Sequence, residues 1–325
     1  MTQSLEQAMQ AFHPQLPLGV AYSGGADSTT LLVQCARRWP GQVVALHINH
    51  GLQAAAMDFE AHCQRTCTAF NVPLRVQAVQ AFHSPGQSPE DAARIARYQG
   101  LLALAEGGEQ QPRLPSIALA QHADDQIETL LLALSRGAGI AGLSAMPMSW
   151  NRAGIAFHRP LLHVASATIR NWIADERIAC IHDPSNTDER FTRNRIRACV
   201  MPALQTAFPQ LLDTWSRSAA HAAQAQSLLD EIAGEDLDQM LRMHDHLPLI
   251  KALQTLNPQR QANALRHWLK TAYGVIPSTA QLHELQRQIQ ACTTRGHRLH
   301  IKVGAGFVKR RGQVLDWYNP AVLPD

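Results

Sequence analysis

The stretch Leu18–Leu32, LGVAYSGGADSTTLL, decides the fold prediction for this chain. It opens with a short apolar run typical of a buried strand, breaks at Ser23–Ser28, and resumes with apolar residues at helical spacing. The adjacent glycines Gly24 and Gly25 let the backbone approach a ligand closely, because neither residue carries a Cβ atom. Amides of such a loop and of the helix that follows it favour an anion. The stretch therefore predicts a cradle for phosphate or pyrophosphate.

This loop differs from the common nucleotide-binding motif G-x-x-x-x-G-K-[ST], because no lysine follows the glycines and Asp27 stands in the loop. A carboxylate beside phosphates makes chemical sense chiefly when a divalent cation bridges the two, so Asp27 is a candidate ligand of Mg²⁺. The structural alternative is a tight turn that contains Ser, Gly and Asp by chance, since short glycine motifs recur.

The composition indicates a globular chain with enough apolar residues to fill a core. Of its 325 residues, 46% are hydrophobic, so we expect one large or two ordinary domains. No window approaches roughly eighteen uninterrupted apolar residues, and the N-terminus lacks the layout of a signal peptide, so we expect no membrane partner and a cytoplasmic location. The six cysteines form no C-x-x-C pair, which indicates reduced thiols. A net charge of +3 does not by itself indicate a nucleic-acid partner.

Strand-like and helix-like segments alternate along the first part of the chain. Further buried strands are expected at Gln42–Ile48, Leu74–Val79, Ile117–Ala120 and Ile155–His158. The alternation predicts an α/β fold with a doubly wound parallel sheet, in which ligands bind outside the carboxyl ends of the strands. The Gly24 loop should therefore share one edge with His47 and His50. Either histidine contacts a nucleotide there, or it is a packed or solvated side chain.

A second polar cluster follows the strand expected at 117–120. Asp124, Asp125 and Glu128 fall in the first turn of a helical pattern that closes at Arg136-Gly137. They complement the helix dipole, which would by itself explain three acids. Paired carboxylates at a strand's carboxyl end also hold Mg²⁺ or a substrate ammonium group, and we favour this functional interpretation.

Arginine supplies most of the positive charge. Arg190, Arg193 and Arg197 share one helical face that carries no acid, a pattern more typical of phosphate contact than of a solvated face. Arg94 and Arg97 lie three residues apart on another expected helix, where solvated surface charge is the plainer explanation.

The pattern changes towards the C-terminus, and we expect a catalytic ATP-binding domain at 1–214 followed by a smaller, mainly helical domain at 215–325. Its helices are expected at Ser216–Met243, Pro258–Tyr273 and Ser278–Cys292, and a hairpin at Leu299–Trp317. The segment 295–311 carries Arg298, Lys302, Lys309 and further arginines without an acid. We favour nucleic-acid contact over a charged edge that merely keeps the hairpin soluble.

Several motifs together indicate one family. SGGADS resembles the SGGxDS signature of the PP-loop ATP pyrophosphatase superfamily, whose members split ATP into AMP and pyrophosphate. HINHGL, SPEDAARIARY, AQHADDQIETLLLALSRGAGIAGL, RPLL and HDPSNTDERFTRNRIR, in this order, resemble the tRNA(Ile)-lysidine synthetase family. LNPQRQANALRHWL and PSTAQLHEL resemble the recognition domain that follows that family's catalytic core. Longer members of the family carry a further C-terminal domain.

The resemblance implies a tRNA-modifying ligase with ATP as co-substrate and Mg²⁺ as its ion. ATP would adenylate the cytidine at the first anticodon position of isoleucine tRNA, releasing pyrophosphate. The ε-amine of lysine would then expel AMP and form lysidine. The implied partners are isoleucine tRNA with a CAU anticodon and free L-lysine, with a homodimer as an open alternative to a monomer.

The resemblance also assigns roles. The implied ATP-binding residues are Ser23, Gly24, Gly25, Ala26, Asp27, Ser28 and His50, with Asp27 on Mg²⁺. Lysine would be held by Arg94, Arg97, Asp125 and Glu128, with His122 as a candidate proton acceptor. The implied catalytic residues are Asp27, Asp125, Glu128, Arg193 and Arg197. Contacts to tRNA fall to Arg190, Arg193, Arg197, Arg298, Lys309, Arg310 and Arg311.

Three other functions could use the same loop. A PP-loop tRNA thiolase typically uses C-x-x-C pairs, whereas Cys63 and Cys67 are the closest pair in this chain. A non-catalytic adenine-nucleotide sensor would need neither the paired carboxylates of Asp125 and Glu128 nor the arginine face. An amidotransferase-type synthetase would need an ammonia-producing domain, for which the chain has no room.

Overall fold

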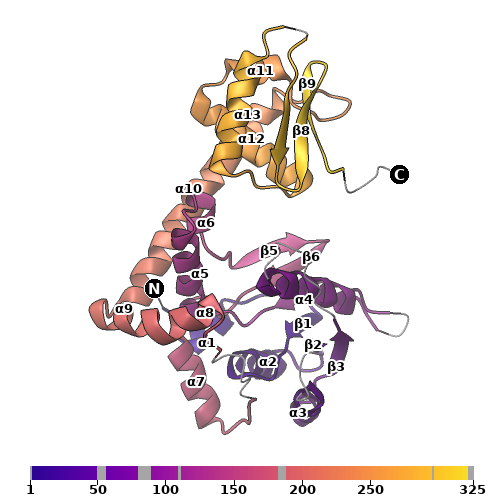
Figure 1. Ribbon diagram of the computed structural model, residues 1–325. Helices are drawn as coiled ribbons and strands as arrows, with labels where there is room; N and C mark the ends of the chain where they lie inside the picture. The colour runs from indigo at the N-terminus through magenta and orange to yellow at the C-terminus, as the bar shows by residue number, and fades with distance from the viewer. Residues whose placement is uncertain are drawn as a thin grey trace. The chain divides into compact units, whose positions relative to one another are not determined.

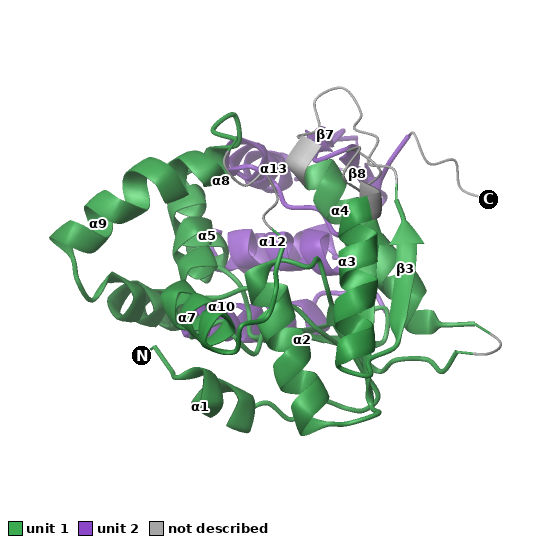
Figure 2. Ribbon diagram, turned by 90° about the horizontal axis from the view of Figure 1, so that it is seen from below, with its two compact units in different colours: residues 1–222 green, residues 223–325 purple. Residues whose placement is uncertain are grey.

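The computed structural model describes residues 2–49, 56–79, 89–108, 111–181, 188–294 and 296–320. The chain divides into two compact units, residues 1–222 and residues 223–325 (Figure 2). The division falls inside the long helix α10 (Leu211–Asp238), which also contains the expected boundary after residue 214. None of the described helices is both long and apolar enough to span a lipid bilayer.

Unit 1 is built on a six-stranded sheet with the order β3-β2-β1-β4-β6-β5 (Figure 1). Its strands are β1 (Leu18–Ala21), β2 (Val43–Asn49), β3 (Leu74–Ala78), β4 (Ser116–Ala118), β5 (Ser149–Arg152) and β6 (Ile155–His158). All neighbouring pairs are parallel except β5 and β6, so the expected doubly wound parallel sheet is confirmed. The edge strand β5 was not expected, because its residues SWNR are mostly polar and mostly exposed.

Helices cover both faces of this sheet. The principal ones are α2 (Ala26–Arg38), α3 (Ala56–Ala69), α4 (Pro89–Glu106), α5 (Ala123–Ser135) and α7 (Ser166–Asp175), with the short α1 (Leu5–Gln10) and α6 (Ile140–Leu143) beside them. Successive side chains of β2 alternate between two cores: Val43 and Ala45 pack with α2, whereas Val44 and Leu46 pack with α4. This alternation is what a strand buried on both faces requires.

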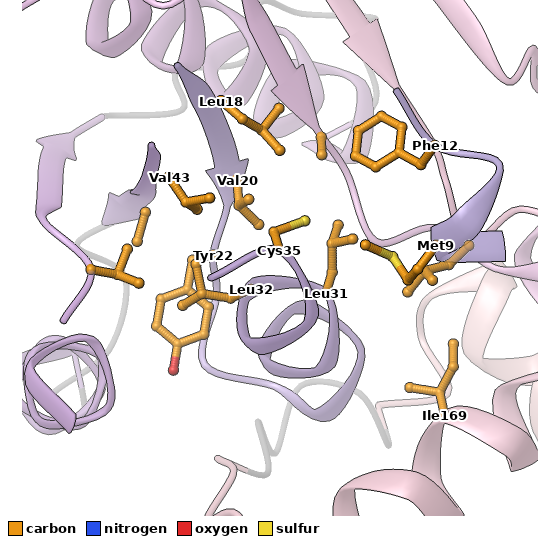
Figure 3. Packing of buried hydrophobic residues seen from close by; sticks show 14 of the residues in the cluster. Met9, Phe12, Leu18, Val20, Tyr22, Leu31, Leu32, Cys35, Val43 and Ile169 are labelled. Atoms are coloured by element: carbon orange, nitrogen blue, oxygen red, sulfur yellow. The ribbon is translucent and has the colours of Figure 1, made fainter. Parts of the chain in front are cut away.

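The first of these cores fixes α2 below β1 (Figure 3). Leu31, Leu32 and Cys35 of α2 are fully buried against Leu18 and Val20 of the strand. Each buried leucine contributes about 1.5–3 kcal/mol relative to an exposed one. The core therefore holds the start of α2, and with it the glycine loop, in a fixed position at the end of β1.

A separate cluster joins α5 to the helices that follow the sheet. Ile127 of α5 packs with Ile196, Met201 and Leu211. These belong in turn to the π-helical turn η2 (Ile196–Val200), to α9 (Met201–Ala207) and to α10, and α8 (Thr192–Arg195) leads into this turn. The contact places the arginines of α8 and η2 beside the first turns of α5.

Unit 2 packs three helices, α11 (Ile250–Thr255), α12 (Pro258–Tyr273) and α13 (Thr279–Ala291), against a three-stranded antiparallel sheet. Asn257 caps α12, Pro258 begins it, and Gly274 ends it in the left-handed conformation at φ 66°. The sheet consists of β7 (His300–Val303), β8 (Gly306–Arg311) and β9 (Val314–Tyr318), so the expected hairpin gains a third strand. The helix expected at 216–243 is α10, which begins and ends about one turn earlier.

Candidate active site

The glycine loop turns sharply between β1 and α2. Gly24 lies at φ +85°, in the left-handed region that favours glycine, and a Cβ atom on it would meet Ile181 Cδ1 at 3.1 Å and Cys63 Sγ at 3.3 Å. The hydroxyls of Ser23 and Ser28 lie 3.0 Å apart and close the loop on itself. A side chain at the position of Gly24 would therefore displace the loop.

The start of α2 carries no side-chain cap, since its N-cap residue is Gly25. The first intrahelical hydrogen bond runs from the amide of Thr29 to the carbonyl of Gly25 at 2.9 Å. The amides of Ala26, Asp27 and Ser28 precede it and have no acceptor within the helix. Three converging N–H groups at a helix N-terminus suit an anion.

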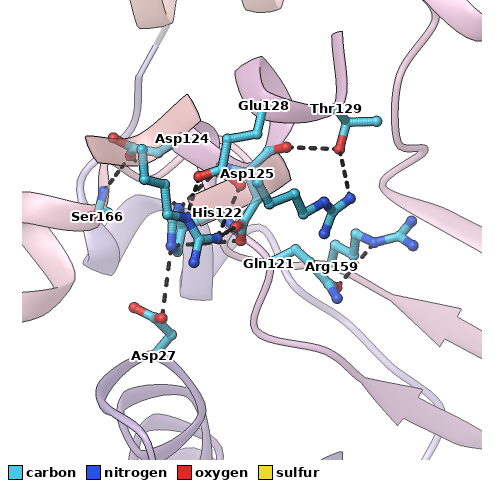
Figure 4. A network of polar contacts seen from close by, with 11 residues as sticks. Asp27, Gln121, His122, Asp124, Asp125, Glu128, Thr129, Arg159 and Ser166 are labelled. Atoms are coloured by element: carbon cyan, nitrogen blue, oxygen red, sulfur yellow. Dashed lines mark hydrogen bonds and ion pairs between the residues drawn. The ribbon is translucent and has the colours of Figure 1, made fainter. Parts of the chain in front are cut away.

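Asp27 lies on this first turn and faces a second helix start, that of α5. Its side chain is 43% exposed, and its carboxylate lies 3.7 Å from Nε2 of His122 (Figure 4). Partial burial raises the pKa of Asp27, and the charge of Asp125 adds to the rise, whereas His122 and Arg197 oppose it. The two helix starts are therefore electrostatically coupled.

His122 is the N-cap of α5. Its Nδ1 accepts the amide of Asp125 at 3.4 Å, while the carboxylate of Asp125 accepts the amide of His122 at 3.1 Å. Its Nε2 lies 3.7 Å from the carboxylate of Asp27 and 3.5 Å from that of Asp125. The same ring nitrogen therefore faces one carboxylate from each helix start.

Asp124, the third acid of this turn, supports the fold. Its carboxylate accepts the amide of Ser166 at 2.8 Å, at the start of α7, which otherwise lacks a side-chain cap. This contact brings α7 towards the loop, where the charge of Arg170 acts on Asp27. No motif in the sequence had indicated Arg170.

Arg197 joins the two remaining carboxylates of α5. Its Nη2 donates to Asp125 at 2.7 Å and to Glu128 at 3.0 Å, and its Nε donates to the other oxygen of Glu128. The side chain of Glu128 is 1% exposed, and burial raises its pKa against the opposing effect of Arg197. Asp125, Glu128 and Arg197 thus form one network, whereas the sequence pattern predicted carboxylates facing a substrate ammonium group and an arginine facing phosphate.

A cationic group borders this network. Arg193 Nη2 approaches the Thr129 hydroxyl at 3.5 Å, and that hydroxyl donates to the carbonyl of Asp125 at 2.8 Å. Desolvation by the surrounding protein lowers the pKa of Arg97, and the neighbouring positive charges of Arg193 and Arg94 lower it further. Arginines from α4 and α8 therefore lie close enough to act on one another.

Arg159 is a buried member of the site that sequence reasoning did not single out. It donates to Gln121 at 3.1 Å, stacks over Trp150 at 4.0 Å, and approaches the hydroxyl of Tyr98 at 3.4 Å. It thereby holds the residue before His122 in place. Its motif RPLL was the available signal, but Gln121 and Tyr98 lie 38 and 61 residues away in the sequence.

Other expected residues lie elsewhere. His50 is outside the described residues, and His47 is buried with Nδ1 donating to the carbonyl of Tyr22 at 2.9 Å, which supports its alternative as a packed side chain. Arg190 pairs with Asp188 at 2.7 Å.

The basic residues of unit 2 differ in their engagement. Arg310 donates to the carbonyls of Gly312, Thr294 and His297. Arg311 donates to Asp245 at 2.6 Å. Arg298 is exposed, and Lys309 lies over the ring of Tyr318 at 4.4 Å.

The comparison with known proteins agrees with this geometry. A family model described as a PP-loop domain matches residues 1–204, and one described as the TilS substrate binding domain matches residues 249–315. The tRNA(Ile)-lysidine synthase of Polaromonas naphthalenivorans (strain CJ2) is 56% identical over 94% of this chain and 90% of its own length. The chain belongs to the tRNA(Ile)-lysidine synthase family. The expected resemblance is thereby confirmed.

Members of this family differ in length. The tRNA(Ile)-lysidine synthase of Burkholderia pseudomallei (strain K96243) is 40% identical over 89% of this chain, but the match spans 59% of that protein. A solved structure, the U34-tRNA thiolase NcsA from Methanococcus maripaludis, shares the fold with a TM-score of 0.56 at 11% identity over 66% of this chain and 76% of its own. PP-loop domains use ATP, and the Ser23–Ser28 loop lies within the residues that the PP-loop model matches.

Proposed function

We propose that this chain is an ATP-dependent ligase that converts the first anticodon cytidine of isoleucine tRNA to lysidine, releasing AMP and pyrophosphate. The observation that carries the proposal is the position of His122. Its imidazole lies between Asp27, on the anion-binding helix start, and Asp125, on the carboxylate cluster. A nucleotide and a cationic substrate bound at these two places would be neighbours.

The loop would hold the part of ATP that leaves. Uncapped amides at Ala26–Ser28 suit the β- and γ-phosphates. Mg²⁺ typically binds through one or two carboxylates together with substrate phosphates, and the half-exposed Asp27 is a carboxylate of that kind. Bound there, Mg²⁺ would offset charge on the departing pyrophosphate. Among the described residues, no three His, Cys, Asp or Glu side chains form a metal-binding group, which fits an ion held largely by the nucleotide.

The carboxylate cluster suits the ammonium groups of lysine. Asp125 and Glu128 carry two negative charges against the single positive charge of Arg197, so the cluster retains an excess negative charge. The bordering Arg94, Arg97 and Arg193 supply the opposite sign for the lysine carboxylate or for phosphates. A site with both signs matches a zwitterionic amino acid with a second amine.

The attacking ε-amine must be neutral when it reacts. Positive charges near an amine disfavour its ammonium form, and the arginines bordering the cluster act in this direction. His122, whose Nε2 faces both Asp27 and Asp125, would orient these two carboxylates. Arg193 or Arg197 would stabilise charge at the α-phosphate or contact tRNA phosphate.

The test is pyrophosphate release from ATP with isoleucine tRNA, with and without free lysine, followed by mass analysis of the anticodon nucleosides. We expect release that depends on tRNA and a lysidine product that depends on both substrates. Release that ignores tRNA and lysine would overturn the proposal.

The thiolase alternative is disfavoured by the thiols themselves. Burial raises the pKa of Cys63 and of Cys67 to about 12, so both remain neutral and poorly nucleophilic. The nucleotide sensor is disfavoured because it would leave the buried carboxylates and their arginines unexplained.

A further inference from the structure

The helix α7 runs beside α2 in unit 1 and in the same direction. At the start of α7 the amide of Ser166 donates to Asp124, in the first turn of α5, at 2.8 Å. At its end Glu176 forms an ion pair at 2.7 Å with Arg37, in the last turn of α2. Between these ends Ile169 packs into the core that buries α2 (Figure 3). The position of α7 along α2 is therefore fixed at both ends.

This placement brings the side chain of Arg170 level with the first turn of α2. Along α2, Asp27 precedes Arg37 by a rise of about 15 Å, and along α7 Arg170 precedes the end of the helix by about 9 Å. A long side chain on a helix points towards the helix N-terminus, so the guanidinium covers the remaining distance. Burial raises the pKa of Asp27, and the charge of Arg170 is among those that oppose the rise, as expected for two groups at the same level.

Arg170 is exposed, and its donors are not engaged by the described part of the chain. No hydrogen bond or ion pair joins it to another described residue, whereas Arg197 already donates to two carboxylates of α5. A guanidinium presents five donors in a planar fork that matches phosphate oxygens. The neighbouring amides at the start of α2, which has Gly25 as its N-cap, lack a side-chain acceptor. An unpaired cation therefore borders a helix start that suits an anion.

We propose that Arg170 is a further ATP-binding residue, which contacts the β- and γ-phosphates and holds them as they leave as pyrophosphate. Its charge offsets the negative charge that the leaving group gains when the bond between the α-phosphorus and the bridging oxygen breaks. A phosphate of tRNA is a less suitable partner, because Arg170 is level with the turn of α2 whose amides suit the nucleotide. The inference rests on the proposed function, since it adds a residue to the phosphate site proposed there.

The experiment measures the affinity of the full chain for pyrophosphate in the presence of Mg²⁺ by titration calorimetry, and the KM for ATP in tRNA-dependent pyrophosphate release. Arg170→Gln should weaken pyrophosphate binding about 10-fold and raise the KM for ATP by a similar factor, because it removes a charge-assisted hydrogen bond. Arg170→Lys keeps the charge but not the planar fork, so it should lose less affinity than Arg170→Gln. Arg38→Gln is the matched control, because Arg38 is an exposed arginine in the last turn of α2, at the end away from the loop.

Two further ligands separate a phosphate contact from other roles of Arg170. Adenosine carries no phosphate, so Arg170→Gln should bind it as the wild type does, and the affinity for isoleucine tRNA without ATP should also stay unchanged. Pyrophosphate binding equal to that of Arg38→Gln would overturn the inference, as would equal losses of adenosine and pyrophosphate affinity or a loss confined to tRNA. Pyrophosphate binding that depends on Arg170 in a chain that forms no lysidine would overturn the proposed function and leave this inference standing.

Discussion

Two helices begin at the same edge of the sheet of unit 1, and they begin in opposite ways. At α2 the N-cap is Gly25, so the amides of Ala26–Ser28 face outward without a side-chain acceptor. At α5 the N-cap is His122, and a capping box with Asp125 satisfies the helix's own amides. One start is left open for an anion, and the other is filled.

The filled start has a different use for its acids. Asp125 accepts the amide of His122 with one carboxylate oxygen and Arg197 with the other, and Glu128 accepts Arg197 with both of its oxygens. The helix N-terminus of α2 thus suits an anion, whereas the first turns of α5 bind cations. The difference is that the N-cap residue of α5 carries a side-chain acceptor and that of α2 does not. His122 then connects the two starts through Nε2.

The largest effect should follow from removing the one charge on the open start. Asp27→Asn keeps the size of the side chain but removes the carboxylate, and we expect tRNA-dependent pyrophosphate release to fall at least about 1,000-fold. Asp175→Asn is the matched control, because Asp175 is an exposed aspartate at the end of α7. Substantial release by Asp27→Asn would remove Asp27 from the catalytic group.

A smaller loss is expected at the filled start. Asp125→Asn removes one of two carboxylates, and we expect the KM for lysine to rise about 10- to 100-fold. Steady-state kinetics with lysine as the varied substrate measures this change. An unchanged lysine KM would show that the amino acid binds elsewhere.

The same variant should shift the pH profile of adenylation. The negative charge of Asp125 raises the pKa of Asp27, and the role proposed for Asp27 requires its ionised form. Removing that charge lowers the pKa of Asp27, so the acid limb of pyrophosphate release should move to lower pH. Measuring release without lysine isolates this half-reaction. A shift to higher pH would contradict the coupling between the two starts.

The contact between His122 and Asp27 can be removed while the N-cap of α5 is kept. In His122→Asn the amide oxygen replaces Nδ1 as acceptor for the Asp125 amide, but nothing replaces Nε2. We expect unchanged thermal stability and about 10-fold slower pyrophosphate release. His122→Ala should additionally lose about 1 kcal/mol of stability, because it also removes the cap. Equal rates in wild type and His122→Asn would reduce His122 to a capping residue.

Strands and helix starts, which depend on contacts between residues close in the sequence, could be predicted from local sequence patterns. Apolar runs predicted β1 and β2, and the glycines and acids marked both helix starts at the correct edge of the sheet. The missed features depend on contacts between distant segments. Asp124 caps a helix that begins at Ser166, and Arg159 donates to Gln121, which lies 38 residues earlier in the sequence.

The roles of the arginines were unpredictable for the same physical reason. A guanidinium carries five donors, and whether it binds phosphate or protein depends on which acceptors folding brings near it. Arg310 meets three backbone carbonyls, whereas Arg298, twelve residues earlier, is exposed. Charge in the sequence indicated a basic segment but not this division of tasks.

The smallest effect should come from giving the open start the cap that it lacks. At Gly25 φ is −74° and a Cβ atom would meet its nearest neighbour, Ser23 Oγ, at 3.7 Å, so Gly25→Ser fits without strain. The new hydroxyl can accept an amide of the first turn, which should stabilise the free protein by a few tenths of a kcal/mol. That amide is then withdrawn from the anion, so we expect the KM for ATP to rise several-fold while the lysine KM stays unchanged. Gly25→Ala is the control, since it adds a Cβ atom but no acceptor. If Gly25→Ser and Gly25→Ala raise the ATP KM equally, the effect is steric, and the contrast between an open and a filled helix start does not explain where the phosphates bind.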